Sequence, residues 1–98
     1  MFARITRFEG PSERVDELHH ALVNRTLPAV RRLDGFAGAL VFADHQSGKV
    51  QVVVLWESEQ AMSASEESAY WFRIYSSEAS SETVTGVERY EVVFSERI

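Results

Sequence analysis

The 98-residue sequence predicts an α+β fold in which an antiparallel four-stranded sheet carries two helices on one face. Three observations lead to this expectation. Apolar residues recur at helical spacing in two segments, short β-branched and aromatic runs flank those segments, and the element order is therefore β-α-β-β-α-β. No linker, repeat or low-complexity tract interrupts the chain, so we expect a single domain over residues 1–98.

The first strand and the first helix follow from residue type and spacing. Residues Phe2 to Glu9 are rich in aromatic and β-branched side chains, and Gly10-Pro11 ends the run. Ser12 is a good N-cap, and Gly35 is a natural C-cap. Between these caps, the residues at helical spacing are Val15, Leu18, Leu22, Thr26, Ala29 and Leu33.

Pro28 lies inside this helical pattern. It has no N–H to donate to the carbonyl of Asn24, and its ring crowds that carbonyl, so we predict a kink or break near Leu27. Two interpretations stay open. The region is either two abutting helical segments or a kinked helix that opens a pocket mouth beside Asn24.

A hairpin follows the first helix. Residues Phe36 to Asp44 form the second predicted strand, and Lys49 to Glu57 form the third. The turn between them, "HQSGK", offers Gly48 for a positive φ angle. The two strands are therefore expected to pair in antiparallel fashion.

Ser58 is expected to cap a second helical region that reaches about Ser81, and a fourth strand is expected from Thr83 to Ser95. Eight serines in residues 58–81 weaken this helix, because serine hydroxyls compete for backbone hydrogen bonds. They indicate either a solvated face with a break near Ser65 or a mobile wall that admits a substrate. The completed order is the ferredoxin-like pattern.

Both faces of this sheet are apolar. A half-buried strand alternates apolar and polar side chains, whereas residues 52–56, "VVVLW", are apolar throughout. Two helices cover only one face, and an exposed apolar sheet promotes aggregation. We therefore expect a homodimer through the sheet face, with a barrel-like core between two copies. The small side chains of the second strand are expected on the helix side: Ala37, Ala39, Val41 and Ala43.

Composition excludes several classes of protein. Without cysteine the chain has no disulfides, no thiolate nucleophile and no cysteine-ligated zinc, and no histidine pair has the helical spacing of a metal site.

A net charge of −5 argues against a nucleic-acid partner. The N-terminus lacks a signal-peptide pattern, and the longest apolar stretch, residues 36–43, is too short to span a membrane, so we expect a soluble cytoplasmic protein.

Few side chains are suited to chemistry. His19 lies on the apolar arc of the first helix, where it is either a proton-accepting base or a half-buried histidine that packs and bonds to the backbone or water. Trp71 and Tyr75 offer flat walls for a planar aromatic guest, while Phe72 is suited to core packing. Arg73 pairs either with an anionic oxygen of that guest or with solvent. The predicted pocket residues are Asn24, Trp56, Ser65, Trp71, Phe72 and Tyr75.

Two stretches, "LPAVRRLDGFAGALVFAD" and "VVVLWESEQAMSASE", resemble the antibiotic biosynthesis monooxygenase-like family of the dimeric α/β-barrel superfamily. The resemblance implies a small pocket between helices and sheet. Some members oxidise phenolic or anthrone-like substrates with dioxygen and without metal or flavin. Others degrade haem with an asparagine, a tryptophan and a histidine, whose positions are taken here by Ala3, Ser65 and Tyr75, so the haem-degrading set is absent.

From the resemblance we expect the protein to be a cofactor-independent monooxygenase that acts on a small aromatic or polyketide-like substrate. In this interpretation His19 is the base, and no cofactor or metal takes part. The alternative is a non-catalytic dimer that binds a small hydrophobic molecule or serves as an accessory subunit. A purely structural dimer would have a pocket filled by its own side chains.

Overall fold

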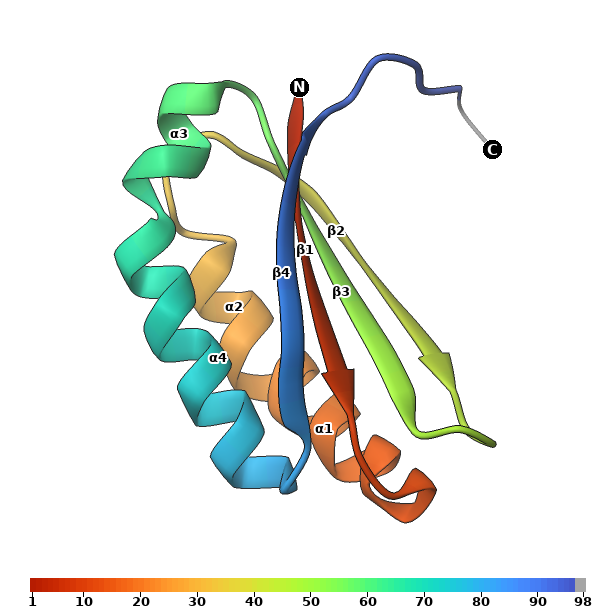
Figure 1. The fold of residues 1–98 in the computed structure, drawn as a ribbon. Coiled ribbons are helices and arrows are strands. Elements are labelled where there is room, and N and C mark those ends of the chain that lie inside the picture. Colours follow the sequence, from red (N-terminus) through yellow and green to blue (C-terminus); the bar gives the residue numbers. More distant parts are fainter. Residues whose placement is uncertain (97–98) are drawn as a thin grey trace.

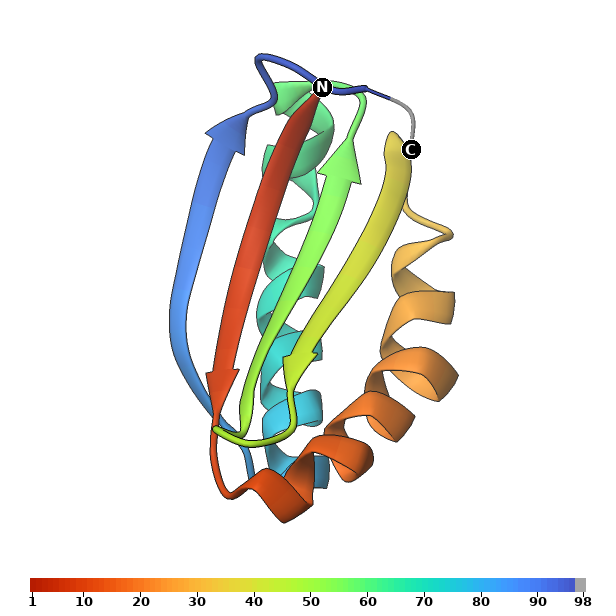
Figure 2. The same ribbon diagram turned by 90° about the vertical axis from the view of Figure 1, so that its right-hand side faces the viewer.

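The computed structural model describes residues 1–96 and has the predicted element order. Its strands form one antiparallel sheet in the order β2-β3-β1-β4, and the helices all lie on one face (Figure 1). Figure 2 looks onto the other face, which no helix covers. The strands are β1 (Phe2–Glu9), β2 (Phe36–Asp44), β3 (Lys49–Trp56) and β4 (Thr83–Glu91).

The first helical region is irregular, as Pro28 predicts, but the irregularity begins earlier. It comprises the 3₁₀ turn η1 (Ser12–Arg14), α1 (Val15–Ala21), the π-helical segment η2 (Leu22–Thr26) and α2 (Leu27–Val30). The departure from α-helix starts at Leu22 rather than near Leu27. Pro28 sits in the first turn of α2, where a missing N–H costs little. The interpretation as abutting helical segments is thus closest to the structure.

The second helical region breaks where its serines predict. The Ser58 hydroxyl accepts a hydrogen bond from the Ala61 N–H at 3.1 Å and caps α3 (Glu59–Ala64). Ser65 interrupts the helix, and α4 (Glu66–Ser80) follows it. The predicted cap at Ser58 and the predicted break near Ser65 are both confirmed.

Four boundary predictions are wrong. Gly35 is not the C-cap of the first helical region, which ends at Val30 with Arg31 as its C-cap. Ser12 does not cap the first helix with its side chain, because it is already inside η1. Strand β3 ends at Trp56, one residue before the predicted end at Glu57. Strand β4 ends at Glu91 rather than at Ser95, because the chain then turns away across the end of the sheet (Figure 2).

Alternation along the strands separates a helix-facing side from an open side. On β2, Ala39, Val41 and Ala43 pair with buried residues of β3, so their predicted place on the helix side is confirmed. Ala37 is the exception. It has no paired residue on β3, because the β2–β3 register shifts between Phe36 and Gly38 and a bulged residue leaves the alternation of its strand.

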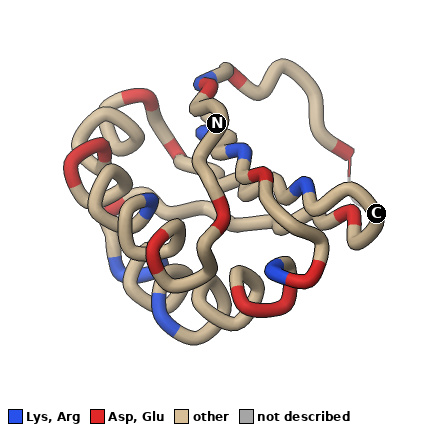
Figure 3. Tube along the Cα trace, turned by 60° about the horizontal axis from the view of Figure 1, so that its bottom comes forward, with Lys and Arg blue, Asp and Glu red and all other residues tan. Residues whose placement is uncertain are grey.

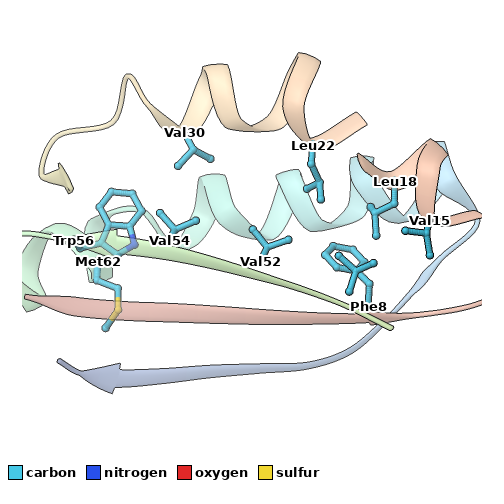
Figure 4. Close-up of a cluster of buried hydrophobic side chains, with 10 residues drawn as sticks. Phe8, Val15, Leu18, Leu22, Val30, Val52, Val54, Trp56 and Met62 are labelled. Carbon is cyan, nitrogen blue, oxygen red and sulfur yellow. The ribbon is translucent and has the colours of Figure 1, made fainter. Parts of the chain in front are cut away.

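The core lies between the helices and the helix-facing side of the sheet (Figure 4). Trp56 lies at one end beside Met62, and Phe8 lies at the other end beside Leu18. The ring of Phe36 meets Trp56 edge to face, with centroids 6.3 Å apart. Trp56 is only 1% exposed, so the end of β3 is anchored in the core rather than in solvent.

Charged residues of both signs are interspersed along the described chain (Figure 3). Residues 1–96 therefore contain no continuous run of Lys and Arg of the kind that binds nucleic acid, and the net charge of the chain is −5. Within the same residues, no helix has the length and apolar character needed to cross a membrane.

One carboxyl group is buried away from the pocket. Glu82 is 1% exposed, and neither of its carboxylate oxygens has a hydrogen-bond partner among the described residues. It lies against Gly10, where an added Cβ would come within 1.9 Å of Glu82 Oε2. Burial raises the pKa of the Glu82 carboxyl. Glycine at position 10 thus leaves room for a carboxyl group that is most easily buried in its neutral form.

We expect Glu82→Gln to stabilise the protein at pH 8. Because the raised pKa disfavours the ionised form in the folded state, wild-type stability falls as pH rises above the unfolded value of about 4.3. Melting temperatures at pH 8 and pH 4 check this, with the exposed Glu78→Gln on α4 as the control. A gain of equal size at both pH values would contradict the role of ionisation.

Candidate functional site

A pocket lies between the helices and the helix-facing side of the sheet. Its volume is about 40 Å³. That is room for roughly three water molecules at ~10–15 Å³ each. Its apolar lining includes Leu22, Val52, Val54 and Phe72. Its polar lining consists of Arg4, Thr6, Thr26, Ser65, Arg73 and Ser76. An apolar wall with a few polar groups is typical of a small-molecule site.

The π-helical segment η2 forms one wall of this pocket. Its first and last residues, Leu22 and Thr26, both line the pocket. The Thr26 and Ser76 hydroxyl oxygens lie 2.9 Å apart, so η2 and α4 are hydrogen-bonded across the pocket lining. Such segments occur frequently at functional sites, because they change the diameter of a helix locally.

Arg4 brings a charge into the helix-facing side of β1. Its side chain is 4% exposed, and its Nη2 donates to the Met62 carbonyl at 2.7 Å and to the Ser65 hydroxyl at 2.9 Å. The Met62 carbonyl also accepts from the Ser65 N–H at 3.2 Å and from the Ser65 hydroxyl at 2.7 Å. Nη2 also donates to Glu66 Oε2 at 2.8 Å, which supplies the opposite charge. A buried charge needs this combination of partners to be tolerated.

Glu66 joins Arg4 to the edge of the sheet. Arg89 of β4 binds its carboxylate with two hydrogen bonds, from Nε at 2.7 Å and from Nη2 at 2.6 Å. These bonds from Arg89, and then the bond and charge of Arg4, lower the pKa of Glu66 to about 2 against an opposing effect of burial. The carboxylate therefore stays ionised at neutral pH and fixes Arg4 from one side.

Three side chains that line the pocket each carry a buried N–H group with no acceptor among the described residues: Arg4 Nε, Trp56 Nε1 and Arg73 Nη1. These three nitrogen atoms are themselves almost wholly covered by surrounding protein atoms. Burial, followed by the charge of Arg4, lowers the pKa of Arg73, which reflects two guanidinium groups in one partly desolvated region.

The structure brings three of the predicted pocket residues together. Trp56, Ser65 and Phe72 all line the pocket. Ser65 owes its position to the break between α3 and α4, and Phe72 projects from α4 towards the core cluster.

The other four predicted site residues lie outside this pocket. His19 is exposed and lines a shallow surface groove with Asp16 and His45. Asn24 and Tyr75 line a different groove on the helix surface, where the Asn24 amide donates to the His20 carbonyl at 3.0 Å. Trp71 is 58% exposed and packs edge to face on Tyr70. The roles predicted for these four residues stay predictions.

Four polar residues of the pocket were not among the predicted site residues: Arg4, Thr6, Thr26 and Ser76. The sequence did point to Arg4. Arg4, Thr6 and Phe8 alternate along the first strand, so they lie on the same side of it, and this side is buried. A charge on the buried side of a strand is unusual and marks a functional or paired group. Arg73 had been considered for an anionic oxygen, and it does line the pocket.

Among residues 1–96, no group of three or more histidine, aspartate or glutamate side chains is placed to hold a metal ion.

The sequence profile of the antibiotic biosynthesis monooxygenase family matches residues 1–75. The chain belongs to this family. It is 33% identical to the uncharacterised Mycobacterium tuberculosis protein Rv2557 over 67 residues, or 68% of this chain, and it spans only 30% of that relative's length.

Solved structures have the same fold. A Deinococcus radiodurans protein assigned to this family has a TM-score of 0.76 and 22% identity, with 100% of this chain and 98% of that chain covered. The Streptomyces coelicolor monooxygenase ActVA-Orf6, in complex with nanaomycin D, has a TM-score of 0.68 and 21% identity, covering 99% and 89%. A mutant of SnoaB, a cofactor-independent oxygenase of Streptomyces nogalater, has a TM-score of 0.68 and 12% identity, covering 96% and 94%. The predicted ferredoxin-like fold is confirmed.

We expect Glu66→Gln to destabilise the protein at pH 7 by about 1–3 kcal/mol, because it removes the carboxylate that neutralises Arg4. The lowered pKa means that this stabilisation is present above about pH 4.5 and is lost as pH falls towards 2. Urea denaturation at pH 7 and pH 3 measures it, with the neighbouring exposed Glu67→Gln as control. A loss that does not shrink at pH 3 would contradict the ion pair.

Proposed function

We propose that this protein is a cofactor-independent monooxygenase of a small aromatic or polyketide-like substrate. The observation that carries the proposal is the pocket itself, which in a member of this family combines a mostly apolar wall with a few polar side chains. The family and its structural neighbours include cofactor-independent oxygenases, which supports the same activity here.

The proposed reaction needs no electrons from outside the substrate. An acidic ring CH₂ loses a proton, and the resulting carbanion reduces dioxygen. One oxygen atom forms the new carbonyl and the other leaves as water, so the four electrons that dioxygen accepts all come from the CH₂ carbon. The protein's contribution is to orient the substrate and to exclude water from the reacting carbon.

Substrate entry requires the pocket to widen, because its volume of about 40 Å³ is less than an aromatic ring system occupies. Two irregular helical segments adjoin it, namely η2 and the break at Ser65. Both are positions where backbone geometry changes with few lost hydrogen bonds. We assign them the role of adjustable walls, in keeping with the mobile wall predicted from the serines.

The lining residues that the structure describes include no histidine and no carboxylate. This favours a substrate that ionises through its own acidity, and it also favours the second candidate function, a non-catalytic dimer that binds a small hydrophobic ligand. His19 is the base predicted from sequence. Because its side chain is exposed outside the pocket, we expect His19→Ala to keep at least half of the wild-type rate.

Oxygen uptake by metal-free protein over a panel of anthrones, hydroquinones and naphthols tests the activity. Ala69→Phe is expected to abolish uptake, because Ala69 lines the pocket and a phenyl ring fills it. Ala79→Phe is the control, since Ala79 is exposed on the same helix, outside the pocket.

Uptake that survives Ala69→Phe would place the reaction elsewhere. Ligand binding that is lost in Ala69→Phe, without uptake in any variant, would favour the binding protein. Uptake that is lost in His19→Ala would restore His19 as the base.

We further propose that the open face of the sheet binds a second copy of the chain. Leu40, Phe42 and Tyr90 project from this face with at least half of each side chain exposed, at 53%, 53% and 50%. Removing one such side chain from water is worth about 1.5–3 kcal/mol. Val93 and Phe94, in the chain after β4, are also largely exposed, at 89% and 78%. Dimerisation is typical of this family, which supports the same assembly.

Light scattering at micromolar concentration should give the mass of a dimer for the wild type. Phe42→Glu should shift it to a monomer or to aggregates, because a charge enters the proposed interface. Val23→Glu, at an exposed position of η2, is the matched control and should stay dimeric. A stable wild-type monomer would overturn the proposed assembly.

A further inference from the structure

The wall between η2 and α4 separates the pocket from a groove on the outside of the molecule. Thr26 of η2 and Ser76 of α4 line the pocket, whereas the residues that precede them, Arg25 and Tyr75, line the groove. Neighbouring residues of a helix point about 100° apart, so the same turn of each helical segment contributes to both spaces. The pocket and the groove are therefore separated by a thin layer of side chains.

Two contacts hold this wall together. The Thr26 and Ser76 hydroxyl oxygens lie 2.9 Å apart in a hydrogen bond on the pocket side, where the two residues are 7% and 1% exposed. On the groove side, the guanidinium carbon of Arg25 lies 5.0 Å from the centroid of the Tyr75 ring. Among the described residues, no other hydrogen bond joins η2 to α4. These two contacts together form a clasp between the two helical segments.

The segment on one side of the clasp is held by an irregular set of hydrogen bonds. η2 is π-helical, and Pro28 supplies no N–H to the turn before it. The side-chain amide of Asn24 donates to the His20 carbonyl at 3.0 Å, so a side chain takes part in holding this turn. Segments with few buried backbone contacts open at a lower free energy than the rest of a fold. η2 is therefore the part of this wall that moves at low cost.

The other walls of the pocket are held more firmly. The sheet side consists of β1 and β3, which are the two central strands and pair on both edges. At the break between α3 and α4, Arg4 holds Met62, Ser65 and Glu66 through three hydrogen bonds, one of them also an ion pair. Because the pocket has a volume of about 40 Å³, one wall has to move before a ring system enters. The wall with the fewest bonds is the one between η2 and α4.

We infer that a ligand enters the pocket between η2 and α4, and that the clasp is the gate of this entrance. Opening separates Thr26 from Ser76 and Arg25 from Tyr75. The inference rests on the proposal that the pocket is the substrate site, but it does not depend on the oxygenation chemistry. Ala79 lies one turn of α4 beyond Tyr75 and takes no part in the clasp.

Thiol labelling measures this opening without a ligand, because the chain has no cysteine of its own. Val54→Cys and Val52→Cys each place a thiol on the pocket lining, at positions that are 8% and 6% exposed. Dithiodipyridine, a flat aromatic disulfide, labels such a thiol only when the pocket opens. Val50→Cys is the matched control, since Val50 lies on the same strand, is 2% exposed and does not line the pocket.

One variant removes each contact of the clasp. Thr26→Val keeps the side-chain volume without the hydroxyl and should speed the labelling of Val54→Cys about fivefold. Tyr75→Leu removes the aromatic ring and should speed it about threefold. Neither variant should change the labelling of Val50→Cys. Tyr70→Leu is the same change at an exposed position of α4 outside the pocket and the groove, and it should leave both rates unchanged.

Equal acceleration of the pocket thiol and the control thiol would indicate a general loss of stability and would overturn the inference. A labelling rate of Val54→Cys and Val52→Cys that neither clasp variant changes would overturn it as well. The labelling involves neither substrate nor dioxygen, so its result is separate from that of oxygen uptake. Faster labelling of the pocket thiols alone, without oxygen uptake by any variant, supports the gate and refutes the monooxygenase.

Discussion

The buried charge of Arg4 is the constraint on which the pocket depends. An arginine on the helix-facing side of a central strand is tolerated only with acceptors close by. The Met62 carbonyl and the Ser65 hydroxyl, at the break between α3 and α4, accept hydrogen bonds from Arg4, and the following residue, Glu66, supplies the opposite charge. The Ser65 hydroxyl in turn donates to the Met62 carbonyl at 2.7 Å. The buried arginine and the break in the helix thus belong to one hydrogen-bond network.

The second irregular helical segment, η2, belongs to the first helical region and lines the same pocket. Segment η2 places Leu22 and Thr26 on the pocket lining, and the Thr26 hydroxyl meets Ser76 of α4. Pro28 lies two residues after η2, in the first turn of α2, and Ser65 lies at the break between α3 and α4. The pocket therefore lies beside both irregular helical segments and is lined on the sheet side by the buried Arg4.

Much of the fold was predictable from sequence, and much of the site was not. The strands, the hairpin and the break near Ser65 follow from residue type and spacing within a few neighbours. The pocket depends on contacts between distant segments, such as Arg4 with Ser65, which are 61 positions apart. His19 illustrates the limit, since its angular position on the helix suggested burial whereas the structure leaves it exposed. Val15, Leu18 and Leu22 are buried, so the buried stripe of this helix is narrower than the apolar arc that the helical angles outline.

Because side chains alternate between the two faces of a strand, the central strands contribute both to the pocket and to the proposed dimer interface. Along β1, Arg4, Thr6 and Phe8 face the helices, while Ile5 faces the open side where the second copy is proposed to bind. Neighbouring residues of one strand therefore belong to the pocket and to the proposed interface. A second sheet packed on the open side would hold β1 and β3 rigid from behind, and a rigid strand is what keeps Arg4 and Trp56 in place when the helical walls move. The flexible half of the pocket is then the helical half, which is where both irregular segments lie.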